Sequence, residues 1–91
     1  MARIRWTADA RVRYRTLIDH ISDHNPSASK KIAARIRHVL EHAAQRPLMF
    51  RMGRVPGTRE AVAHPNYIVV YRVEATTILV VAVLHARQIY P

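Results

Sequence analysis

The chain contains no cysteine, only two glycines and only six acidic residues in a length of 91. Without cysteine, neither a disulfide nor a thiolate zinc site can stabilise it, an absence that suits a reducing cytoplasm. No apolar run reaches membrane-spanning length, and the N-terminal residues lack the apolar centre of a signal peptide. We therefore expect one cytoplasmic domain over residues 1–91, with a single core and no membrane contact.

Basic residues are abundant. Lys and Arg number 15 against six Asp and Glu, which gives a formal net charge of +9. All of these cations except Lys30 and Lys31 are arginines, and arginine favours two-pronged contacts with phosphate and carboxylate groups. So positive a field attracts polyanions or an acidic partner protein. The alternative is a charge that serves only solubility.

The first half of the chain predicts one strand and two helices. Residues 2–6 alternate polar and apolar side chains, which indicates an edge strand. Thr7 is a suitable N-cap for a helix, and an apolar stripe at helical spacing follows it. Asn25 and Pro26 then begin a second helix that runs to about Arg46. Two helices separated by a short break are typical of an antiparallel hairpin.

The second half predicts a loop and three strands. Both glycines lie in the segment 48–58, which we expect to be an ordered loop. The segments 59–64, 67–73 and 78–86 are separated by turn residues, and the last two are rich in β-branched side chains. We predict an α+β fold of order β-α-α-β-β-β. The N-terminal strand and the helical hairpin pack on one face of an antiparallel sheet.

The last two predicted strands are apolar at nearly every position. A strand in a sheet that is covered on one side normally alternates apolar and polar residues. Something must therefore cover part of the second face. Three covers are possible: the loop around Met49 to Met52 with the C-terminal tail, a surface for self-association, or a partner.

Two histidine pairs have the spacing of metal ligands. His20 with His24, and His38 with His42, each lie four residues apart on a predicted helix, so each pair shares one helical face. No carboxylate accompanies them at a metalloprotease spacing, and the chain has no phosphate-binding glycine loop or nucleophile motif. We therefore expect exposed histidines, no metal and no cofactor.

Basic and aromatic residues of the sheet region form the one candidate site. Its members are Arg51, Arg54, Arg59, Arg72, His85, Arg87 and Tyr90. If these residues share a rim of the sheet, they could bind a phosphodiester, with a histidine to move a proton and a tyrosine to stack on a base. The alternative is that Arg59 and Arg87 are structural ion pairs and Tyr90 is an apolar plug.

Two segments carry a family resemblance. The stretch "RVPGTREAVAHPNYIVVYRV" (residues 54–73) and the stretch "ILVVAVLHARQIYP" (residues 78–91) are similar to the RelE/ParE superfamily of bacterial type II toxins, and most similar to its ParE-like branch. The resemblance covers residues 54–91 closely. The preceding strand and helical hairpin agree with the family in order and length, with less specific sequence.

The resemblance implies a partner and one of two targets. Members are neutralised by a small antitoxin, which we expect to be acidic, partly disordered and bound in a hetero-oligomer. ParE-like members inhibit DNA gyrase without catalysis, whereas RelE-like members cleave messenger RNA on the ribosome.

For an endoribonuclease, the resemblance would give catalytic roles to Arg59, His85, Arg87 and Tyr90. This chain departs from the ribonuclease pattern, because Arg51 and Arg54 stand where those members carry lysines or a glutamate. A guanidinium stays protonated and is a poor general base. We therefore expect a gyrase-directed growth inhibitor in which Arg51, Arg54, Arg59, Arg72 and Arg87 are candidates for contact with the target or with nucleic acid.

Overall fold

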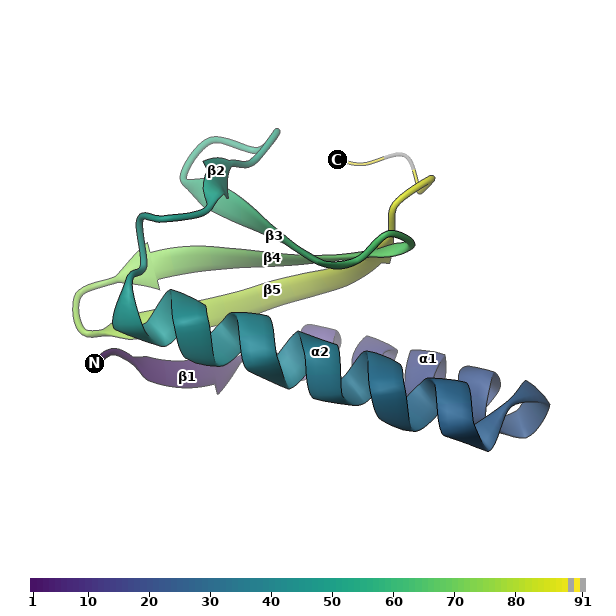
Figure 1. Cartoon of the computed structure of the whole chain (residues 1–91). Coiled ribbons are helices and arrows are strands. Elements are labelled where there is room, and N and C mark those ends of the chain that lie inside the picture. Colours follow the sequence, from purple (N-terminus) through teal and green to yellow (C-terminus); the bar gives the residue numbers. More distant parts are fainter. Residues whose placement is uncertain (89, 91) are drawn as a thin grey trace.

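The computed structural model describes residues 1–88 and Tyr90, and over these residues it comprises two helices packed on one sheet (Figure 1). The elements in chain order are β1 (Arg3–Trp6), α1 (Ala8–His24), α2 (Pro26–Gln45), β2 (Arg51–Met52), β3 (Thr58–His64), β4 (Tyr67–Glu74) and β5 (Thr77–His85). The predicted α+β fold, with a helical hairpin on one face of the sheet, is confirmed.

The sheet differs from the prediction in two details. Its strand order is β1-β5-β4-β3-β2, and β1 runs parallel to β5, so the sheet is mixed and not wholly antiparallel. The pattern of a single strand cannot reveal this, because parallel and antiparallel ladders both use backbone groups. The second detail is β2, a two-residue strand within the predicted loop that pairs with β3. A strand of two residues is too short to show an alternation of polar and apolar side chains.

Capping residues set the ends of the two helices. The Thr7 hydroxyl accepts a hydrogen bond from the Ala10 N–H at 3.0 Å, as predicted for an N-cap. Asn25 ends α1 and begins α2, since its N–H donates to the Ile21 carbonyl at 2.7 Å and its side chain accepts from the Ala28 N–H at 3.1 Å. One residue therefore joins the helices, and α1 continues to His24, within the segment 22–29 that the sequence predicted as a break. Neither of these described helices has the length and apolarity needed to cross a bilayer.

The hydrophobic core lies between the helices and one face of the sheet. Ile36 and Leu40 of α2 are buried, and they pack with a cluster that includes Tyr71, Ile78 and Val80 in the central strands. Helix α1 contributes less, with only Ala10 fully buried among its residues. Within the helical hairpin, α2 therefore contributes most of the buried side chains, and α1 packs against β5.

Apolar side chains are also buried on the second face of the sheet. Ile68 and Val70 alternate with core residues of β4, so they point away from the helices, yet they are only 5% and 2% exposed. The loop that carries β2 lies on that side of the sheet (Figure 1). Arg54 in this loop sits 4.7 Å from the centre of the Tyr90 ring. Of the three covers considered for this face, the structure places the loop and Tyr90 there.

Candidate functional site

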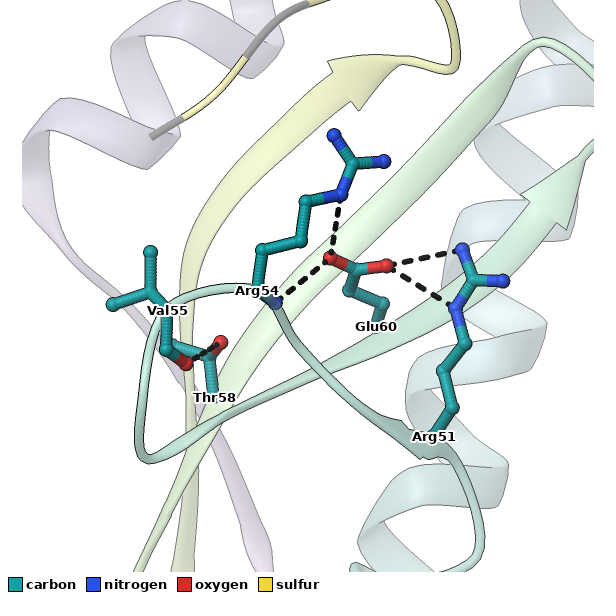
Figure 2. Close-up of polar contacts among 5 residues, drawn as sticks. All are labelled: Arg51, Arg54, Val55, Thr58 and Glu60. Atoms are coloured by element: carbon teal, nitrogen blue, oxygen red, sulfur yellow. Dashed lines mark hydrogen bonds and ion pairs between the residues drawn. The ribbon is translucent and has the colours of Figure 1, made fainter.

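A buried carboxylate holds two arginines on the second face of the sheet. Glu60 of β3 has a side chain only 3% exposed. Its Oε1 accepts from Arg51, with Nε at 3.1 Å and Nη2 at 3.0 Å. Its Oε2 accepts from the Arg54 backbone N–H at 3.3 Å and lies 3.7 Å from the Arg54 Nε (Figure 2). We call Arg51, Arg54 and Glu60 the arginine cluster.

The backbone around β2 and β3 positions the cluster. Arg51 is paired with Glu60 in the β2–β3 ladder, which places both side chains on one face. The turn between the strands is closed by the Gly53 N–H, which donates to the Thr58 carbonyl at 2.7 Å. A Cβ at Gly53 would collide with the Thr58 hydroxyl, and Gly57 has φ of +84°, which favours glycine. Both glycines are therefore needed for this turn.

The cluster keeps a positive charge that solvent can reach. One carboxylate neutralises only one of the two guanidiniums, and the Arg51 and Arg54 side chains are 57% and 48% exposed. The Arg72 guanidinium lies beside the same turn, 3.6 Å from where a Cβ of Gly57 would stand. The Tyr90 ring stacks under the Arg54 guanidinium in a cation–π contact. This surface can bind an anion or an acidic side chain.

Arg59 has a different role, on the side of the sheet that faces the helices. Its Nη1 donates to the carbonyls of Leu48 and Phe50, at 3.2 and 2.8 Å. The buried Tyr71 hydroxyl donates to the Pro47 carbonyl at 2.6 Å. These two side chains fix the segment that leads from α2 into β2, so they position the arginine cluster from the opposite face.

His85 lies far from Arg59 along the strands. It pairs with Tyr67 at the end of β5, whereas Arg59, near the start of β3, is level with Tyr71 in the middle of β4. The His85 ring is 5.5 Å from the Tyr67 ring, and its Nδ1 accepts from the Arg87 N–H at 3.1 Å. His85 also lines a groove against α1, so it faces the helix side.

The structure therefore brings together only part of the predicted set. Arg51, Arg54 and Tyr90 meet on the second face, and Arg72 lies beside them. Arg59 and His85 lie on the other face and well apart along the strands, and Arg87 is exposed in the turn after β5. Among the described residues, the seven candidates therefore do not all lie along one rim of the sheet.

Sequence reasoning missed the organising role of Glu60. The candidate set drawn from the sequence contains no carboxylate, whereas the structure places Glu60 between Arg51 and Arg54. The available signal was an acidic residue within a segment that otherwise predicts a strand, close in sequence to several arginines. A buried charge in such a strand requires an ion partner.

A second surface lies between α1 and β5. A groove of about 750 Å³ is lined on one side by Asp9, Arg13, Thr16, Leu17 and His20, and on the other mainly by the end of β5. The strand β1 pairs only with Thr77–Val80, so within the described residues the next five residues of β5 have no strand on that side. The sequence contains a signal for this open edge, because the first predicted strand is shorter than the last.

Ionisation of buried tyrosines makes the stability depend on alkaline pH. Burial raises the pKa of Tyr71 above its ordinary value of 10.0, and the nearby Arg59 guanidinium opposes this shift. Burial raises the pKa of Tyr14 in the same way, opposed by Arg37. A raised pKa means that the unfolded chain loses its phenolic protons first. In urea melts from pH 8 to pH 11, we expect the free energy of unfolding to stay constant below pH 10 and to decline above it. Tyr14→Phe should make this decline less steep. An unchanged dependence of the unfolding free energy on pH would contradict the prediction.

Among the described residues, no group of three or more histidine, aspartate or glutamate side chains is arranged to hold a metal ion. The fold and the arginine cluster thus define a small, basic α+β domain with an anion-attracting surface and an open strand edge.

Comparisons with known proteins identify the family. Residues 4–90 match the family described as "ParE toxin of type II toxin-antitoxin system, parDE". The protein Y4kP of Sinorhizobium fredii, a toxin by name, is 36% identical over 90 residues, which are 98% of this chain and 93% of that protein. The chain therefore belongs to the ParE toxin family of type II toxin–antitoxin systems.

Two solved structures share the fold. The chromosomal ParDE toxin–antitoxin system of P. aeruginosa superimposes with a TM-score of 0.71 at 20% identity, over 93% of this chain and 96% of that chain. The YoeB-YefM complex of Staphylococcus aureus gives a TM-score of 0.64 at 15% identity, over 99% of each chain. At these identities the likeness extends to the fold alone.

Proposed function

We propose that this toxin stops growth by binding DNA gyrase and does not act as a nuclease. The observation that carries the proposal is the composition of the arginine cluster. Among the described residues, Arg51 and Arg54 have a buried carboxylate and Tyr90 beside them, while His85 faces the helices on the other side of the sheet. Guanidiniums can clamp an anion or an acidic protein surface, but they cannot accept a proton near neutral pH.

A cognate antitoxin is the second part of the proposal. The net charge of +9 favours an acidic partner, and the open β5 edge offers backbone groups to an added strand. The groove beside this edge can hold the side chains of such a segment, with Leu17 as an apolar contact. The complexes named for the two structural neighbours, ParDE and YoeB-YefM, agree with a toxin that is held by a partner. We expect both proteins to meet in the cytoplasm.

Leu17→Arg tests the docking groove. We expect the variant to inhibit growth as before but to escape the cognate antitoxin, because a charged side chain blocks the apolar floor of the groove. A well-packed contact of this kind is worth about 2 kcal/mol of binding free energy. The measurements are the growth of bacteria that express the variant together with the antitoxin, and the affinity between the two proteins from calorimetry. Val12→Arg is the matched control, since Val12 is exposed on α1 and does not line the groove; equal rescue of both variants would refute the groove.

An endoribonuclease is the competing function. The contact that favours it is the Tyr90 ring under the Arg54 guanidinium, since an aromatic ring beside a cation suits a stacked RNA base. In that case His85 and Arg87 would have to reach the substrate from the other side of β5, with Arg59 as a second phosphate clamp.

His85→Ala separates the two functions. General acid–base groups contribute about 10²- to 10⁴-fold to a rate, so a nuclease that uses His85 would lose its toxicity. A gyrase binder should keep its growth inhibition within about twofold, because the imidazole faces the helix side and donates nothing to the arginine cluster. The readout is the inducer concentration that halves growth. Loss of toxicity with antitoxin binding intact would support the nuclease.

A further inference from the structure

The two histidine pairs share one spacing but differ in geometry. His38 and His42 lie in the last turns of α2 and are exposed, and their Nε2 atoms face each other at 3.1 Å. Their ring centres are 4.5 Å apart in an edge-to-face arrangement. Neither ring contributes to the core, the arginine cluster or the groove. The two ring nitrogens thus face each other on the exposed side of α2.

The distance between the two Nε2 atoms matches the separation of two nitrogen ligands bound to one metal ion. Two imidazole nitrogens bound to one ion at about 2.1 Å lie about 3.0 Å apart at neighbouring corners of an octahedron, and about 3.4 Å apart in a tetrahedron. The observed 3.1 Å falls between these values, so a small rotation of either exposed ring satisfies either geometry. The ring that now donates through Nε2 needs only to move this proton to Nδ1, which solvent can do.

We propose that His38 and His42 form a two-histidine site for a late first-row divalent cation, of the class of Ni²⁺, Cu²⁺ and Zn²⁺. Imidazole is a preferred ligand for these ions, and oxygen-preferring ions such as Mg²⁺ are not expected to bind. The position helps, because the C-terminal end of a helix carries partial negative charge and His42 is in the last turn of α2. With no third protein ligand among the described residues, water completes the coordination.

The pair on α1 supplies an internal control. His20 and His24 have the same four-residue spacing and a similar ring distance of 4.8 Å. The His24 Nδ1, however, donates to the His20 backbone carbonyl at 2.9 Å, and the structure gives no contact between the two sets of ring nitrogens. Since spacing is equal in both pairs, a difference in affinity would come from the arrangement of the rings.

The test is a calorimetric titration of the purified, tag-free full chain with NiCl₂ in a non-coordinating buffer at pH 7.5, with MgCl₂ as the control ion. We expect one Ni²⁺ per chain and a higher melting temperature in its presence, because the ion binds the helical pair more tightly than it binds the separate histidines of the unfolded chain. His38→Ala and His42→Ala should each weaken binding by more than about tenfold. His24→Ala should leave it unchanged.

Two outcomes would overturn the site. One is no saturable Ni²⁺ binding at millimolar concentration in the wild-type chain. The other is equal weakening by His24→Ala and His42→Ala, which would mean diffuse binding to surface histidines. Circular dichroism of each variant in EDTA shows whether α2 is intact, and the exposure of both side chains predicts an unchanged spectrum and melting temperature.

Discussion

Arg51→Ala combined with Arg54→Ala is expected to lower the free energy of unfolding by about 3 kcal/mol, because it leaves the Glu60 carboxylate buried without a cation. Each arginine is about half exposed, so most of the loss comes from the carboxylate and not from the arginines themselves. Adding Glu60→Leu should recover most of the stability, since an apolar side chain suits the buried position beside Val70. The measurement is urea denaturation followed by circular dichroism.

Arg3→Ala combined with Arg5→Ala is the control for the change in net charge. Both residues are exposed on β1, so this variant should lose less than about 1 kcal/mol. An equal loss in the two double variants would show that overall charge, and not the buried carboxylate, sets the stability. No recovery with Glu60→Leu would also contradict the role given to Glu60.

Tyr71→Ala is expected to cost about 4 kcal/mol, which is the cost of removing a large aromatic side chain from a core. Tyr71 is fully buried at the centre of the sheet, and its ring meets Phe50 edge-to-face at 6.4 Å. A domain of this size has about 5–15 kcal/mol of stability in total, so the variant should be close to unfolding at 37 °C. The same melts, with near-ultraviolet circular dichroism, measure the loss.

Tyr71→Phe isolates the hydroxyl group. It keeps the ring and removes only the hydrogen bond to the Pro47 carbonyl, so the expected cost is about 1 kcal/mol. We also expect faster amide exchange in residues 48–51, because this bond and the two from Arg59 fix that segment. If Tyr71→Phe cost as much as Tyr71→Ala, the packing argument would fail.

The elements could be predicted from the sequence because local signals mark them. Thr7 and Asn25 cap helices through bonds to residues three positions away, and the pattern of β4 and β5 depends on side chains alone. The direction of β1 could not be predicted, because it depends on which strand lies beside it in the folded sheet. The extra strand β2 depends on two residues that gain their pairing from β3.

Several residues of the arginine cluster could be named from the sequence, but their arrangement could not. The sequence places Arg51, Arg54, Arg59 and His85 near strands, yet the face on which each side chain lies depends on register. Neighbouring residues of a strand point to opposite faces, so Glu60 joins the arginine cluster while Arg59 turns to the helix side. A bulge near Val70 shifts the register of β5 as well, which no residue pattern marked.

The most direct test of the proposed function is pulse labelling after tightly controlled induction in bacteria that lack the antitoxin. We predict that thymidine incorporation and DNA integrity fail before methionine incorporation, and that His85→Ala gives the same order of events. If protein synthesis stops first while the DNA stays intact, and His85→Ala abolishes the effect, the chain is a ribonuclease and the gyrase proposal is wrong.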